Sequence, residues 1–99
     1  MIDDAITILA PGVSAATGAA SARSAIPTNS AGNAPNYIRV SARNECYVRV
    51  GTSTVVATAN DTLVQPADAV ILRVAGNTHI AYIQGTAAGL VNVAPLEDV

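Results

Sequence analysis

Two consecutive stretches between Tyr37 and Gly51 alternate aliphatic and polar side chains with a period of two. Successive residues of a β-strand point to opposite faces, so this period predicts two strands that each bury one aliphatic face. The aliphatic side chains are Ile38, Val40 and Ala42 in the first stretch and Cys46, Val48 and Val50 in the second. Asn44 and Glu45 lie between the stretches, and Asn tolerates the positive φ that a tight turn demands. The pattern therefore predicts a β-hairpin.

The aliphatic composition favours strands over the whole chain. The 99 residues include twelve Val and eight Ile but only five Leu, with no Phe, Trp or Lys. Branched side chains suit a half-buried pleated surface, and the common surface helix formers are scarce. Twenty Ala residues predict a thin core, and thin cores are commonly reinforced by association with a partner or with further copies.

Short apolar runs bounded by Gly, Pro and Asn divide the remaining sequence into further strands. We predict them at residues 5–9, 19–26, 54–59, 63–65, 69–75, 78–84 and 90–94. Seven to nine short strands with turns every eight to twelve residues are typical of an all-β antiparallel sandwich or small barrel. We expect a jelly-roll-like arrangement.

The chain has the length of one domain, which we expect to span residues 1–99. Within it, residues 37–94 form the predicted β core and residues 95–99 a C-terminal tail. Residues 13–36 are rich in Ala and Ser, which is compatible with an extended arm. The loose alternation at 19–26, before Pro27, favours instead an edge strand followed by a loop. Both interpretations stay open.

The charged residues limit the classes of partner. All five basic residues are Arg, and seven carboxylates give a net charge of −2, with four of the carboxylates near the chain ends. This balance offers no broad basic surface, so we expect no nucleic-acid partner. Arginine without lysine is consistent with planar, bidentate contacts across a protein interface, or with the compositional bias of a GC-rich genome.

Sequence signals for secretion, membrane insertion and internal disulfides are missing. Asp3 and Asp4 replace the basic start of a signal peptide, and the apolar runs are shorter than the roughly 20 residues that cross a bilayer. We therefore expect a soluble product made in the cytoplasm, with no membrane partner. The single cysteine, Cys46, lies on an aliphatic strand face, which favours a buried structural thiol over a reactive or intermolecular one.

Candidate catalytic groups are few. His79 is the one histidine, and only a meeting with Cys46 in space would combine a nucleophile with a base. A histidine among apolar neighbours is more often structural. One His, one Cys and scattered carboxylates give no metal-ligand spacing, and the sequence has no glycine-rich phosphate loop. We expect no enzyme activity, no metal and no cofactor.

Tyrosine and arginine share the polar face of the predicted hairpin. Tyr37 and Arg39 come from its first strand, and Tyr47 and Arg49 from its second. Protein interfaces favour both residue types, because each offers a large contact area with a polar tip. We predict that these four residues form a protein interface. The alternative is that the tyrosines pack against a second sheet of the same chain.

Four strand-and-turn motifs carry a resemblance to a known group of proteins. They are Tyr-Val-Arg-Val-Gly at residues 47–51, Thr-Val-Val-Ala-Thr-Ala-Asn-Asp at 54–61, Thr-His-Ile-Ala-Tyr-Ile at 78–83 and Gly-Leu-Val-Asn-Val at 89–93. Together they resemble small virion proteins of tailed bacteriophages, over residues 37–93. In that group an aromatic residue precedes the glycine of the first motif, whereas Val50 stands in this chain.

Such virion proteins are similar in size and β-rich character to capsid decoration (cement) proteins. The resemblance implies a non-enzymatic structural component of the virion that binds the major capsid protein and copies of itself, for example as a trimer. Residues 13–36 and 95–99 would serve as arms that add contacts when they order on binding. The alternatives are a head-to-tail connector or tail component and, from another class, a carbohydrate-binding β-sandwich.

Overall fold

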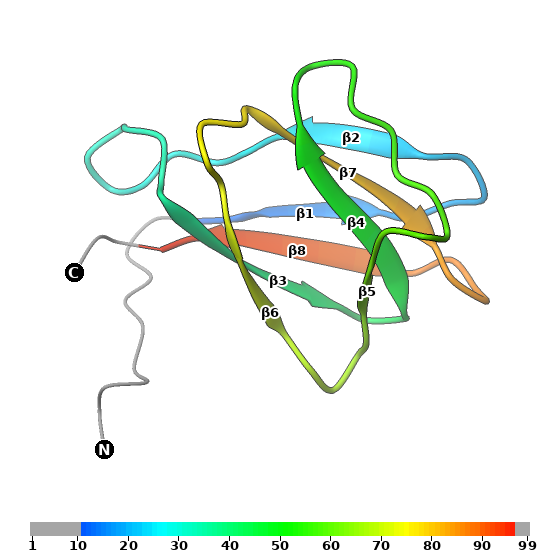
Figure 1. Cartoon of the computed structure of the whole chain (residues 1–99). Coiled ribbons are helices and arrows are strands. Elements are labelled where there is room, and N and C mark those ends of the chain that lie inside the picture. Colours follow the sequence, from blue (N-terminus) through cyan, green and yellow to red (C-terminus); the bar gives the residue numbers. More distant parts are fainter. Residues whose placement is uncertain (1–10, 97–99) are drawn as a thin grey trace.

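The computed structural model describes residues 11–96, and every regular element in this part of the chain is a β-strand (Figure 1). The eight strands are β1 (Val13–Ala16), β2 (Ala22–Ala25), β3 (Tyr37–Ala42), β4 (Cys46–Gly51), β5 (Thr62–Val64), β6 (Val70–Arg73), β7 (His79–Gln84) and β8 (Leu90–Pro95). Among these residues no helix is available to cross a membrane. The strand predicted at 5–9 lies outside the described residues.

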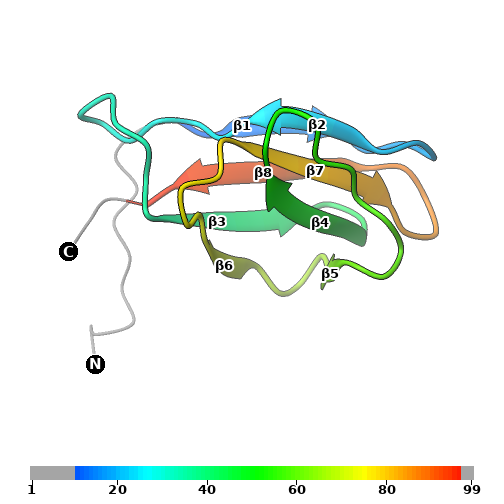
Figure 2. The ribbon, with the colours of Figure 1, turned by 45° about the horizontal axis from the view of Figure 1, so that its top comes forward.

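The strands form two four-stranded antiparallel sheets that pack face to face. Sheet A has the order β1-β8-β3-β6, and sheet B has the order β2-β7-β4-β5. Each strand occupies the position in its sheet that its sequence neighbour occupies in the other sheet: β1 is opposite β2, β8 opposite β7, β3 opposite β4, and β6 opposite β5 (Figure 2). This order is that of an eight-stranded jelly roll, and it confirms the predicted small antiparallel sandwich.

The predicted hairpin between β3 and β4 is wrong. β3 pairs with β6 and β8 in sheet A, whereas β4 pairs with β5 and β7 in sheet B. The connection at residues 43–45 therefore carries the chain from one sheet to the other, and Asn44 does not adopt a positive φ. A period of two is compatible with both arrangements, because each buries one face of each strand. This connection between the sheets, an arch, leaves β3 in the interior of sheet A and β4 in the interior of sheet B. The aliphatic faces of the two strands then lie against each other across the core.

The strand predicted at 54–59 is also wrong, because this segment belongs to the β4–β5 loop at residues 52–61. The loop runs along the outer side of sheet B (Figure 1) and reaches the β2 edge, where the Ala57 N–H donates to Ser21 Oγ at 2.8 Å. Ala57 of the loop is buried, and so is Ala81, an outward residue of β7. The loop therefore contacts the sheet through Ala57, while its threonines and Val56 stay exposed.

Residues 13–36 contribute one edge strand to each sheet, β1 to sheet A and β2 to sheet B. The strand predicted at 19–26 is present as the shorter β2, while β1 is a strand that the Ala- and Ser-rich composition does not indicate. Short edge strands with small or charged side chains discourage unwanted pairing with other chains. The remaining predicted strands are present, with ends shifted by one or two residues.

Aliphatic side chains from both sheets fill the core, as the alternation in β3 and β4 predicts. Its buried members are Ile38, Val40, Cys46, Val48, Val64, Val74, Ile80, Tyr82, Val91 and Val93. Polar groups that enter this layer are paired. The Tyr82 hydroxyl lies 2.6 Å from Ser24 Oγ, and the hydroxyl of buried Thr17 accepts the Gly89 N–H at 2.9 Å.

The turn between β6 and β7 holds its backbone in an uncommon conformation. Ala75 has a φ of +53° and Gly76 a φ of +78°, and the Asn77 N–H donates to the Val74 carbonyl at 3.0 Å. Two consecutive positive φ values are the signature of a type I′ turn, centred one residue before the predicted Gly76-Asn77 turn. In this region the Cβ of an alanine crowds the following carbonyl oxygen, at a cost of roughly 1–2 kcal/mol.

Replacing Ala75 with Gly relieves that crowding, so we expect A75G to raise the free energy of unfolding by about 1 kcal/mol in urea denaturation. Ala87 is the matched control, because it is exposed in a loop and its φ is not positive. A87G only adds freedom to the unfolded chain and should lower the stability by a few tenths to ~1 kcal/mol. Equal effects of the two substitutions would contradict the strain at Ala75.

The Tyr82–Ser24 hydrogen bond joins β7 to the edge strand β2 inside the sandwich. We expect Y82F and S24A each to lower the free energy of unfolding by about 1 kcal/mol. Each variant removes one hydroxyl of the bond and leaves the other hydroxyl without its partner. The double variant should lose less than the two single losses added together, which a double-mutant cycle measures. Strict additivity would show that the bond does not form in solution.

Candidate interaction surfaces

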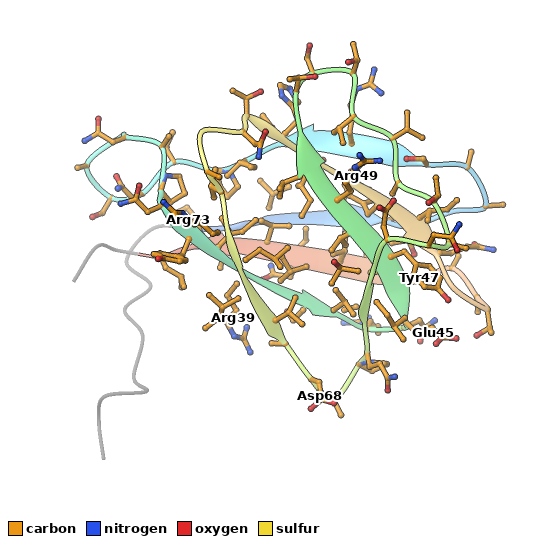
Figure 3. The ribbon with its side chains drawn as sticks, in the orientation of Figure 1. Arg39, Glu45, Tyr47, Arg49, Asp68 and Arg73 are labelled. Atoms are coloured by element: carbon orange, nitrogen blue, oxygen red, sulfur yellow. The ribbon has the colours of Figure 1, made fainter. Side chains whose placement is uncertain are left out.

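The structure divides the four predicted interface residues between two opposite surfaces. The buried residues of β3 and β4 face each other across the core, so the alternate residues point away from it in opposite directions. Tyr37 and Arg39 lie on the outer side of sheet A. Tyr47 and Arg49 lie along β4 on the outer side of sheet B, apart from Arg39 (Figure 3). The prediction that all four share one surface is wrong, and the interface role of each pair stays a prediction.

We call the outer side of sheet A face A. Its outward positions are Ser14 and Ala16 of β1, Leu90, Asn92 and Ala94 of β8, Tyr37, Arg39 and Ser41 of β3, and Ile71 and Arg73 of β6. Arg43 extends the β3 row, because its backbone N–H donates to the Leu90 carbonyl at 2.8 Å. The register places Tyr37 beside Arg73 and Arg39 beside Ile71.

Face A exposes apolar and cationic groups side by side. Ile71 is 53% exposed and Tyr37 is 47% exposed. The guanidinium groups of Arg39, Arg43 and Arg73 form no hydrogen bond or ion pair among the described residues, and no outward position of the face carries a carboxylate. The face therefore presents three positive charges that nothing in the described part of the chain neutralises.

A surface hollow lies at the end of face A, beside the strained turn. It has a volume of about 500 Å³ and is lined by Asn36, Tyr37, Arg73, Ala75 and Gly76. The backbone N–H groups of Ala75 and Gly76 donate no hydrogen bond within residues 11–96. The Tyr37 hydroxyl and the Arg73 guanidinium are likewise without a partner in that range. The residues that line the hollow thus carry several hydrogen-bond donors that are unused within residues 11–96.

We call the outer side of sheet B face B, and it is more crowded. Tyr47 is half-buried between Leu63 of β5 and Ile83 of β7, its register partners. Arg49 lies beside Ala81, which is buried although it points outward from the sheet. At the margin, Glu45 accepts a hydrogen bond from the Thr86 hydroxyl at 2.9 Å. Tyr47 is thus flanked by apolar residues of its own sheet and does not pack against a second sheet, which is the alternative predicted for the tyrosines.

The structure separates Cys46 from His79. Register places Cys46 opposite Gln84 and His79 opposite Gly51, so the two lie at opposite ends of β4. Five residues of strand correspond to about 17 Å. Cys46 faces the core, whereas His79 points outward and its Nδ1 lies 2.8 Å from the Thr78 hydroxyl. The open question of a Cys/His pair is answered, because these two side chains do not meet.

Cys46 is fully buried, which fits the structural thiol predicted for it. Burial raises the pKa of this thiol, because the apolar surroundings disfavour the thiolate. Within residues 11–96, no group of three His, Cys, Asp or Glu side chains is arranged to hold a metal ion.

Comparisons of the chain with protein-family models, with curated proteins and with solved structures gave no match. The basis for assigning a function is therefore the geometry of faces A and B. That geometry adds two residues that the sequence reasoning missed, Ile71 and Arg73. The sequence shows only an aliphatic run interrupted by Arg73, and the register is needed to show that both residues lie beside Tyr37 and Arg39.

The raised pKa of Cys46 makes stability depend on pH in the alkaline range. The unfolded chain loses the thiol proton from about pH 9.0, while the folded protein retains it to higher pH. Rising pH therefore favours the unfolded state between the thiol pKa of the unfolded chain and the higher thiol pKa of the folded protein. We expect the free energy of unfolding of the wild-type protein to fall more steeply above pH 9.0 than that of C46A, measured by urea titration. Parallel curves would contradict burial of the thiol.

Proposed function

We propose that this protein is a non-enzymatic structural component of a bacteriophage virion, which decorates and stabilises the capsid as a homo-oligomer. The observation that carries the proposal is face A: a sheet surface on which exposed Tyr37 and Ile71 alternate with arginines that have no partner among residues 11–96. Tyrosine, arginine and large aliphatic side chains are what protein interfaces favour at their centres. The resemblance of residues 37–93 to small virion proteins supplies the setting.

The fold suits a protein that acts by binding. The jelly roll is a rigid two-layer body, and its architecture recurs in viral capsid proteins and in lectins, so the fold by itself supports either class only by analogy. The strands fix the backbone of face A before binding, so only its side chains have to be ordered when it meets a partner. On a symmetric shell many equivalent weak contacts add up to firm attachment.

The alternatives make different demands on the same surface. A carbohydrate-binding sandwich uses exposed aromatic rings as platforms for sugar rings, and Tyr37 is the tyrosine on face A. A neck or tail component uses the same kind of contact surface but is present in few copies. Copy number and ligand class therefore separate these functions, because all of them can use the same fold.

The direct test is the number of copies in purified particles of the phage that encodes the chain, measured by quantitative mass spectrometry against the major capsid protein. Decoration predicts hundreds of copies, and their release should leave heads that break at lower temperature. Six or twelve copies would assign the chain to the neck, and none would end the virion proposal.

A second test uses the isolated protein. Decoration predicts that it elutes as a closed oligomer in size-exclusion chromatography with light scattering, and that it binds emptied, expanded capsids. I71E provides a variant, because it replaces the most exposed aliphatic group of face A with a carboxylate and should abolish capsid binding while the melting temperature is kept. A strict monomer that ignores capsids but is retained on a glycan array would support the carbohydrate-binding alternative instead.

A further inference from the structure

The charges of this protein are distributed unevenly, although the whole chain is acidic. Residues 11–96 hold all five arginines but only three carboxylates, Glu45, Asp61 and Asp68. The other four carboxylates belong to the residues outside this range. The described part of the chain therefore carries a net charge of +2 inside a protein of net charge −2. Residues 11–96 are therefore basic, although the chain as a whole is acidic.

The positive charge gathers on face A and is not shared with carboxylates of the described residues. Arg39 and Arg73 project from neighbouring strands of the sheet, with Arg43 further along β3. None of the three described carboxylates pairs with these arginines: Glu45 is bonded to Thr86, Asp61 accepts the Thr58 N–H at 2.7 Å, and Asp68 lies in the β5–β6 turn. An exposed arginine without a counter-charge keeps its bidentate donors available to a partner.

This distribution determines which occupants fit face A. Packing face A of one copy on face A of another brings two sets of three guanidinium groups together, which like-charge repulsion opposes. Packing face A on face B of a second copy is opposed as well, because Arg23 and Arg49 flank Ala81 on that face. The complementary occupant is a surface that carries carboxylates.

The hollow at the end of face A supports the same chemistry. The Tyr37 hydroxyl, the Arg73 guanidinium and the N–H groups of Ala75 and Gly76 are donors without partners in the described part of the chain. A carboxylate is an acceptor-only group that can receive several such bonds. The positive φ of Ala75, kept at an energetic cost, shapes the backbone of this hollow.

We propose that face A is the docking surface for an acidic protein partner, with Arg39 and Arg73 pairing with its carboxylates and a carboxylate side chain entering the hollow beside Tyr37. Ile71 and the Tyr37 ring provide the apolar contacts between these charges. The inference rests on the proposed function and deepens it by naming the chemistry of the partner surface. The acidic-partner inference is tested with a simple polyanion, whereas the decoration role is tested with capsids. Either of the two proposals can therefore fail while the other holds.

The experiment measures binding of fluorescein-labelled poly-L-glutamate to the full chain by fluorescence anisotropy. Wild-type protein should bind in low salt and weaken as the ionic strength rises, because exposed charges are screened over about 10 Å at 0.1 M salt. The variant R39E/R73E should bind about tenfold more weakly or not at all. R39Q/R73Q, which removes the charges without reversing them, should fall between the two.

The matched control is R23E/R49E, which changes the net charge by the same amount but on face B. It should bind poly-L-glutamate within about threefold of the wild type, and all variants should keep the wild-type melting temperature, because the substituted side chains lie outside the core. Equal losses in both double variants would overturn the proposal, since the attraction would then belong to the total charge. So would no binding by the wild type, or tighter binding to single-stranded oligo(dT), which would indicate a nucleic-acid surface.

Discussion

The burial of two facing rows of aliphatic side chains, one from β3 and one from β4, is the constraint on which this structure depends. Ile38 and Val40 in one sheet and Cys46 and Val48 in the other are essentially inaccessible to solvent. No Phe or Trp is available to fill the layer, so its stability depends on close contact among small branched side chains. Because each strand is buried on one side only, every second residue must face outward, and the two outward rows must diverge.

That divergence governs the chemistry of the surface. The same alternation that buries the aliphatic side chains sends Arg39 out of one sheet and Arg49 out of the other. The two faces then differ through what lies over and beside them. The β4–β5 loop lies along face B and is bonded to Ser21 at its β2 edge, while face A gains Ile71 and Arg73 from β6. A single sheet bearing all four predicted residues would have one Tyr/Arg surface, whereas the sandwich has two unlike ones.

The sequence predicts the local structure of this protein well and its long-range pairing poorly. The period of two identifies β3, β4 and β7 and their buried residues, because that signal is carried within each strand. It does not say which strands become neighbours, since a hairpin and an arch bury the same faces. Asn44 illustrates the ambiguity: it tolerates a tight turn but does not require one, and the chain crosses between the sheets at this point.

The other departures have the same origin. The Thr- and Val-rich segment at 54–59 has the composition of a strand, yet the edge of sheet B beyond β4 is filled by β5, and the segment lies along the sheet instead. Arg73 reads as an interruption in an aliphatic run, and only the β3–β6 register shows it to be the neighbour of Tyr37. Net charge misleads for a similar reason, because the sum over the chain combines the five arginines of residues 11–96 with four carboxylates outside that range.

The arrangement of β3 and β4 in separate sheets is tested most directly by backbone nuclear Overhauser effects in the isotope-labelled protein. The jelly roll predicts cross-strand contacts between Val40 and Val93 and between Val48 and Tyr82, the register partners of the two sheets. Backbone contacts that pair Ala42 with Tyr47 and Ser41 with Val48 would instead show a hairpin. That result would place the tyrosines and arginines of both strands on one surface and contradict the separation of face A from face B.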